Sequence, residues 1–273
     1  RGTFRMIDIP SNVFKCIDIL NQPDFNFGQV EDLISHSPVL AGNIITIANS
    51  SFYNRGIEIT KLGVALPRLG SGKIKAILYF ASCERQLSNH PLFSQVATHI
   101  VNHSFAVAQI ADYLSFRYYG DSDNAFLAGL LHDVGKLALL KEMASNYAMT
   151  ASPESDLTED SYGDVLPRLH SRIGHMVAKH WQLNPQIATV IGYHHDLDLL
   201  AEEATEDSDI QLVHLIHLAD TVARMLGRGR HIGLVDLPSL AEGLDLHIEW
   251  DADAVEFFAE VPAILKHKDE QVA

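Results

Sequence analysis

Hydrophobic residues recur at three- and four-residue spacing along nearly the whole chain, which is the period of an amphipathic α-helix. One example is Val13, Ile17 and Leu20, which follow Pro10 and Ser11, a pair typical of a helix start. The alternation of apolar and polar residues that is typical of strands is essentially missing. The pattern therefore predicts an all-α protein, with helices at about residues 13–20, 30–34, 39–50, 60–69, 73–87, 91–119, 124–133, 137–149, 165–182, 185–196, 210–226 and 252–266.

Polar stretches interrupt this helical pattern. Asn89-His90-Pro91 separates two helical parts, so we expect an N-terminal helical subdomain at residues 1–90 and a second unit at residues 91–273. Residues 152–163 are rich in Ser, Asp, Glu and Pro, and they predict a surface loop. Residues 200–209 are acidic and predict another solvated loop.

The composition of the chain argues against nucleic acid and membranes as partners. The 273 residues include 20 Lys and Arg against 35 Asp and Glu, for a formal net charge of −15. Because binding to phosphate backbones needs a positive field, we expect no direct nucleic-acid partner. The sequence shows no basic membrane anchor, no starting signal peptide and no apolar run of spanning length, so no membrane association is expected. Cys16 and Cys83 form no CxxC motif, which argues against a thiolate zinc site and fits a reducing cytoplasm.

The stretch from Phe126 to Lys136 carries the most chemistry. It begins as an apolar helix and then presents His132, Asp133 and Lys136 within five positions. An imidazole beside a carboxylate is typical of metal ligands, and a nearby lysine is typical of phosphate binding. Gly135 predicts that the helix ends there, because the turn after a helix favours glycine. We therefore expect His132 and Asp133 at a helix terminus, facing other ligands.

Further candidate ligands lie on other predicted helices. Asp220 occurs in an otherwise apolar helix, where a buried carboxylate needs a partner, and His214 and His217 could orient it. A single helical histidine is more often a surface residue or a hydrogen-bonded core residue, so the prediction depends on the set as a whole. The candidate ligands are His99, His103 (four residues later, on the same helix face), His132, Asp133, His170, His194, His195 and Asp220.

These residues carry a resemblance to a known family. The order His103, His132-Asp133 and Asp220 resembles the HD superfamily of metal-dependent phosphohydrolases, which are helical enzymes named for the His-Asp doublet. Other segments resemble the HDOD domain, the HD-related output domain of bacterial signalling proteins. These segments are Pro38-Val39-Leu40, Ala48-Asn49-Ser50-Ser51-Phe52-Tyr53, Ala65-Leu66-Pro67-Arg68-Leu69-Gly70, His170-Ser171-Arg172-Ile173-Gly174, Trp181-Gln182-Leu183 and His194-His195. The resemblance covers roughly residues 5–225 and implies an N-terminal helical subdomain packed on an HD-type helical core.

The ligand pattern is also similar to that of HD-GYP cyclic-di-GMP phosphodiesterases, which hold two or three metal ions. This likeness implies that His170, His194 and His195 are additional ligands, that His99 occupies the place of a further ligand, and that Lys136 contacts phosphate. The Gly-Tyr-Pro loop of those enzymes is absent, and residues 196–200 read Asp-Leu-Asp-Leu-Leu in its place.

The resemblance implies one or two divalent transition metal ions. Asp133 would bridge them, with His103, His132 and Asp220 on one ion and with His170, His194 and His195 on the other. A set of imidazoles and carboxylates without thiolate suits iron, manganese, zinc or nickel. Such a pair of ions activates water and stabilises the oxygens of a phosphate ester, while Lys136 would neutralise developing charge. Asp133 and Lys136 are therefore the candidate catalytic residues.

Two functions follow as alternatives. The HDOD resemblance implies a cytoplasmic bacterial signalling or regulatory domain, with a retained metal site and a protein partner. The alternative is an active metal-dependent phosphohydrolase that acts on a nucleotide or cyclic-nucleotide phosphoester. The complete ligand set favours the enzyme, whereas the missing Gly-Tyr-Pro loop and the HDOD features favour the regulatory domain.

Overall fold

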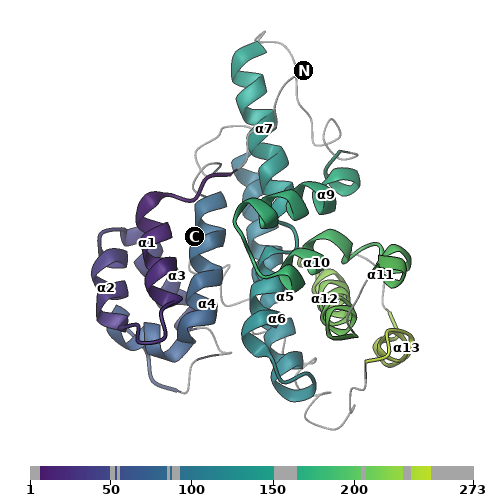
Figure 1. Cartoon of the computed structure of the whole chain (residues 1–273), viewed down its shortest axis with the longest axis horizontal. Helices are drawn as coiled ribbons and strands as arrows, with labels where there is room; N and C mark the ends of the chain where they lie inside the picture. The colour runs from purple at the N-terminus through teal and green to yellow at the C-terminus, as the bar shows by residue number, and fades with distance from the viewer. Residues whose placement is uncertain are drawn as a thin grey trace. The chain divides into compact units, whose positions relative to one another are not determined.

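Helices make up the regular structure of this protein. The structure, a computed structural model, describes residues 7–49, 53, 56–84, 87, 93–150, 165–203, 207–229 and 235–246. Among these residues every regular element is an α-helix, which confirms the all-α prediction (Figure 1). No helix in the described part of the chain is long and apolar enough to cross a membrane. Residues 9–81 form one compact unit, and residues 82–246, joined by the start of the chain, form another.

The first unit contains α1 (Ser11–Leu20), α2 (Phe27–Ser35), α3 (Pro38–Ala48) and most of α4 (Leu62–Glu84). The apolar residues that predicted the first helix form the buried face of α1. The two helices expected at residues 60–69 and 73–87 meet within α4. At that point Gly70 has φ of 78° and ψ of 166°, a backbone conformation that glycine adopts without steric penalty.

The residue after α3 fixes the loop that leads towards α4. The Asn49 side chain accepts a hydrogen bond from the Ile59 amide at 2.7 Å and donates one to the Ile59 carbonyl at 2.6 Å. Both backbone groups of a buried residue are thereby satisfied by one amide side chain. The asparagine in the HDOD-like segment therefore has a structural role in the loop.

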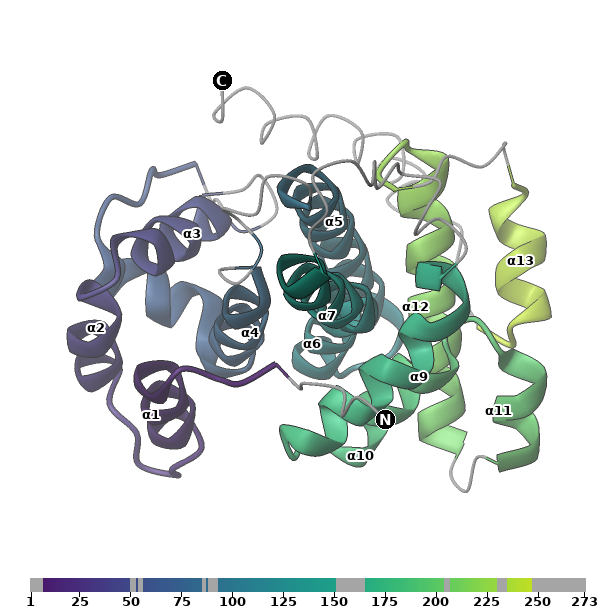
Figure 2. The same ribbon diagram turned by 90° about the horizontal axis from the view of Figure 1, so that it is seen from above.

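The second unit contains the helices that carry the candidate ligands. They are α5 (Ser94–Tyr118), α6 (Ser122–Leu131), α7 (Val134–Thr150), α9 (Val165–His180), α10 (Pro185–Tyr193), α11 (Leu197–Glu203), α12 (Asp207–Met225) and α13 (Leu237–Gly243). Helix α5 packs against α6 and α12, α7 packs against α9, and α10 packs against both α9 and α12 (Figures 1 and 2). The Trp181 indole donates a 2.8 Å hydrogen bond to the Ile7 carbonyl and holds the start of the chain on this unit.

The prediction of an acidic loop at residues 200–209 is wrong. Helix α11 covers its beginning, α12 begins at Asp207, and the Leu200 side chain is buried. The acidic residues around Leu200 made this segment look like a loop, although Leu200 is the buried residue of a short helix. Helix α13 was not expected from the pattern. The predicted break at residues 89–91, loop at 152–163 and helix at 252–266 lie outside the described residues.

Gly135 has a different role from the predicted one. The helix expected to end there ends at Leu131, and Gly135 lies in the first turn of α7. A Cβ atom on Gly135 would lie 1.9 Å from the His170 carbonyl oxygen and 2.6 Å from the Gly174 amide nitrogen. Glycine is therefore required by the close crossing of α7 and α9. Gly129 is similar, because its Cβ would lie 2.8 Å from the Ala108 Cα on α5.

Candidate metal centre

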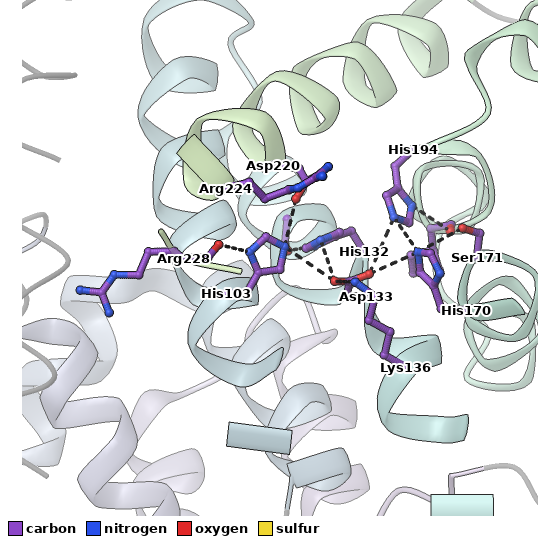
Figure 3. A network of polar contacts seen from close by, with 12 residues as sticks. His103, His132, Asp133, Lys136, His170, Ser171, His194, Asp220, Arg224 and Arg228 are labelled. Carbon is purple, nitrogen blue, oxygen red and sulfur yellow. Dashed lines mark hydrogen bonds and ion pairs between the residues drawn. The ribbon is translucent and has the colours of Figure 1, made fainter. Parts of the chain in front are cut away.

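Seven of the predicted ligands converge in the second unit, although they come from five separate parts of the chain. Figure 3 shows these residues except His195. The inner group consists of His103 on α5, His132 after α6, and Asp220 on α12. The outer group consists of Asp133 before α7, His170 on α9, and His194 and His195 after α10. Within each group the candidate ligand atoms lie within 4.8 Å of one another. The glycine crossings explain this convergence, because they bring α5 close to α6 and α9 close to α7.

Asp133 lies between the two groups. Its Oδ2 atom is 3.4 Å from His132 Nε2 and 3.7 Å from His103 Nε2. Its Oδ1 atom is 3.4 Å from His170 Nε2 and 3.9 Å from His194 Nε2. One carboxylate therefore presents one oxygen to each group, which is the arrangement that a carboxylate shared by two cations would need (Figure 3).

The backbone fixes the orientation of the four buried histidine rings. The Nδ1 atom of His103 faces the Arg228 carbonyl oxygen at 2.6 Å, that of His132 faces the Gly129 carbonyl at 2.7 Å, and that of His170 faces the Leu166 carbonyl at 2.8 Å. The Nδ1 atom of His194 faces the carbonyl oxygens of Val190 and Ile191, both at 3.2 Å. A carbonyl only accepts hydrogen bonds, so each Nδ1 must be the protonated donor. In the neutral imidazole, Nε2 then carries the lone pair, and all four Nε2 atoms face the interior of the site.

A cation would satisfy these lone pairs. His170 Nε2 and His194 Nε2 lie only 3.3 Å apart, yet neither can donate to the other in this tautomer. His132 Nε2 and Asp133 Oδ1 are buried and have no hydrogen-bond partner among the described residues. Buried polar atoms without partners are costly, and a bound metal ion would satisfy both. The donor set therefore fits the metal ions that the sequence implies.

Burial and charge set the protonation of the site. Burial alone would raise the pKa of Asp133, but Lys136, His132 and His170 outweigh it and hold that pKa well below its usual range. Burial lowers the pKa of His170 and lowers that of His194 well below its ordinary value. Burial also opposes the charged form of His132, but Asp133 more than compensates, so the pKa of His132 is raised. His170 and His194 are therefore neutral, as metal ligands must be.

The outer group reaches solvent. His195 is exposed as a residue, and its ring lies 4.2 Å from the ring of His194 between centroids. Lys136 has a side chain that is 23% exposed, and its Nζ is 2.5 Å from Asp133 Oδ2. Arg224 is 30% exposed and lies 3.5 Å from Asp220 Oδ2. A ligand from solvent can thus approach at cationic side chains next to a buried site.

Three histidines named in the sequence analysis belong to neither ligand group. His99 is exposed and belongs to neither group. His214 and His217, which were expected to orient Asp220, instead have Nδ1 contacts with the carbonyls of Leu244 at 2.5 Å and His194 at 2.9 Å. The Asp220 carboxylate lies near Arg224, one helical turn later, and near His103 Nε2 at 3.0 Å. Burial would raise the pKa of Asp220, but these contacts with histidine lower it.

Sequence reasoning missed two supports of the inner group. Arg224 follows Asp220 by four residues, so helical spacing could have identified this ion pair. The contact of His103 with the Arg228 carbonyl has no signal in the sequence. It requires Gly229, whose φ is 117° and whose Cβ would lie 2.8 Å from His103 Nδ1.

The helical fold and the paired ligand groups define a protein of the HD type. A model of the HDOD domain matches residues 6–197, and the chain belongs to the HDOD family. A Shewanella amazonensis SB2B structure, provisionally named a metal-dependent phosphohydrolase, is 21% identical, with a TM-score of 0.70 over 96% of this chain and 93% of that chain. An HDOD domain protein of unknown function from Geobacter sulfurreducens is 22% identical, with a TM-score of 0.62 over 95% and 93% of the two chains.

The chain is also similar to a curated protein sequence. An uncharacterized protein of Treponema pallidum (strain Nichols) is 23% identical over 217 residues, which is 73% of this chain and 40% of that protein. The chain thus spans less than half of the length of this relative. At these identities the solved structures establish the fold alone.

Proposed function

We propose that the protein is a metal-dependent phosphohydrolase whose site holds two divalent transition metal ions. The observation that carries the proposal is the convergence of four Nε2 lone pairs on the two oxygens of Asp133. His103, His132 and Asp220 would hold one ion, and His170, His194 and His195 would hold the other. Iron, manganese, zinc and nickel all suit this donor set. The name given to the Shewanella amazonensis structure agrees with this proposal.

The metal ions would supply Lewis acidity, activating water and stabilising charge on a phosphoryl group. The chain's own residues have three further roles. Asp133 presents one oxygen to each ligand group and would contribute a ligand to both metal positions. Lys136, beside Asp133 and partly exposed, binds a phosphoryl oxygen and neutralises its developing charge. The buried apolar walls of α6 and α12 keep bulk water away from the inner group.

The substrate class is a nucleotide or cyclic-nucleotide phosphoester. Lys136 and Arg224 provide positive charge where the site reaches solvent, and the chain as a whole carries a formal charge of −15. This positive charge would attract an anionic substrate to the site.

A regulatory HDOD domain with a protein partner is the second candidate. It is favoured by the close contact of Lys136 with Asp133 Oδ2, because a lysine engaged in this way is less available to a substrate. A structure from Marinobacter aquaeolei VT8, provisionally named a signal transduction protein, shares the fold with a TM-score of 0.64 at 19% identity, but this chain covers only 61% of it. Under this candidate the metal ions serve structure or sensing.

One experiment separates the two candidates. Protein reconstituted with iron or manganese is assayed beside Asp133→Ala on phosphomonoesters and cyclic dinucleotides, with metal content measured in both. We expect two ions per wild-type chain, and hydrolysis that falls at least about 10²-fold in the variant. Equal rates in the two proteins exclude catalysis at this site. Two bound ions without any hydrolysis favour the regulatory domain.

A further inference from the structure

His217 lies outside both ligand groups but touches the backbone of one of them. Its Nδ1 is 2.9 Å from the carbonyl oxygen of His194. The carbonyl can only accept, so Nδ1–H is the donor. His194 is the C-cap residue of α10, where helix carbonyls have no amide donor in their own helix. His217 therefore supplies a hydrogen bond that α10 cannot supply itself.

The outer group needs this support more than the inner group does. The Nδ1 contacts that orient His103, His132 and His170 measure 2.6 to 2.8 Å, whereas those of His194 measure 3.2 Å and are at the long end of the hydrogen-bond range. Among the described residues, no hydrogen bond holds the His195 ring, which lies against the rings of His170 and His194. The positions of these two neighbouring rings thus depend on the backbone between them.

Helix α12 connects the two groups through this contact. His217 precedes Asp220 by three residues, about one helical turn. The same helix therefore gives a candidate ligand to the inner group and a hydrogen bond to the backbone of the outer group. Helix α10 packs directly against α12, so the link runs through contacting elements.

We propose that His217 is a positioning residue that fixes His194 and His195 as ligands of the outer metal ion. This inference rests on the metal centre of the proposed function but does not require hydrolysis. Hydrogen-bonding partners of metal ligands typically change metal affinity by 10- to 100-fold when they are removed. In His217→Leu the new side chain has a similar bulk but no hydrogen-bond donor. We expect this variant to bind the outer ion about 10- to 100-fold more weakly and the inner ion as the wild type does.

Two further variants make the test specific. In His217→Asn the side-chain Nδ2 occupies the place of Nδ1 and donates, so outer-ion binding is restored. His214→Leu is the matched control, because His214 lies one turn earlier on α12 and makes the same kind of contact, but to the Leu244 carbonyl. A general loss of α12 stability would affect both leucine variants, whereas loss of positioning affects His217→Leu alone.

The experiment titrates the four metal-free proteins with Mn²⁺ and measures bound ions per chain and the electron paramagnetic resonance spectrum. The wild type, His217→Asn and His214→Leu are expected to show two ions and a spin-coupled pair, and His217→Leu one uncoupled ion. If the wild type binds one ion only, and His195→Asn shows that the outer group holds it, its loss in His217→Leu still supports the positioning role. Unchanged binding in His217→Leu, or an equal loss in His214→Leu, overturns it.

Failure of the proposed function gives different results. A wild type that binds no metal overturns the metal centre and the role of His217 together. A wild type that binds two ions, loses one on His217→Leu and hydrolyses no phosphoester overturns hydrolysis while supporting the positioning role.

Discussion

The inner and outer groups use the same chemistry in different surroundings. All three inner residues are buried, and Asp220 is further engaged by Arg224. The outer group has three buried members, but His195 is exposed and Lys136 stands beside Asp133 at the opening. The same side chains can thus make a closed position that holds an ion and an open position where ligands exchange. Under the proposed function, a substrate would therefore approach the outer group.

The two groups also depend on different helix crossings, and the largest effect is expected from breaking one of them. Gly135→Ala places a Cβ 1.9 Å from the His170 carbonyl, so α7 and α9 must separate and move His170. We expect a loss in the free energy of unfolding of about 3 kcal/mol or more, together with loss of the outer ion. Urea unfolding followed by circular dichroism, with metal analysis, measures both.

Two other glycines calibrate this result. Gly129→Ala meets the Ala108 Cα at 2.8 Å and should cost about 1–3 kcal/mol, with the inner ion affected. Gly42→Ala, inside α3 with nothing within 4 Å, should instead stabilise the protein by about 0.5–1 kcal/mol. A Gly135→Ala protein as stable as the wild type contradicts the close crossing.

Removal of the metal ions should reveal the two groups as two steps. Each ion that binds only the folded state stabilises it by about 2.7 kcal/mol when free metal exceeds the dissociation constant 100-fold. We expect a chelator to remove the outer ion first, because the outer group includes the exposed His195, whereas His103, His132 and Asp220 are buried, and the inner ion more slowly. Stopped-flow chelation with a coloured chelator gives the two rates, and differential scanning calorimetry gives the matching steps in Tm. A single rate for both ions contradicts the difference in access.

The sequence predicted the candidate ligands, but it did not predict the contacts that hold their side chains in place. His103, His132, Asp133 and Asp220 were recognisable because polar residues interrupt apolar helices, and the HDOD resemblance completed the set. The role of Gly135 depends on a crossing of two helices from distant segments, which no local pattern encodes. His214 and His217 have nearly the same local setting on one helix, so only the fold shows that one contacts His194 and the other Leu244.

Helix boundaries were likewise predictable where the local pattern is strong, and not where packing between helices decides them. The strongly periodic segments around α1 and α5 were predicted within a few residues. Helix α11 was missed because acidic residues surround Leu200, whose burial is decided by the helices it packs against.

Substituting one residue in each group, in metal-free protein, should show how burial alone changes the effect on stability. Asp220 is 3% exposed, and Asp220→Asn removes a charge that faces both His103 and Arg224. In metal-free protein we expect a loss of about 1–3 kcal/mol in the free energy of unfolding, because Arg224 loses the carboxylate charge with which it pairs. His195→Asn changes an exposed residue and should stay within about 0.5 kcal/mol. Chemical denaturation of both variants provides the measurement, and equal losses contradict the comparison.

The smallest effect is expected at Lys136, where substrate binding and metal binding have opposite requirements. Its ammonium lies 2.5 Å from the Asp133 oxygen that faces the inner group, so it competes with a cation for that oxygen. Lys136→Met removes the charge but keeps much of the side-chain length. We expect a severalfold gain in affinity for the inner ion, since a nearby positive charge disfavours a second one. Hydrolysis of a phosphoester should fall in the same variant, because the phosphoryl oxygen loses its cation.

Metal titration and the assay are run on one preparation, with Lys141→Met on the same helix as control. A parallel loss of metal and activity would show that Lys136 supports the metal site, whereas opposite changes assign it to the substrate.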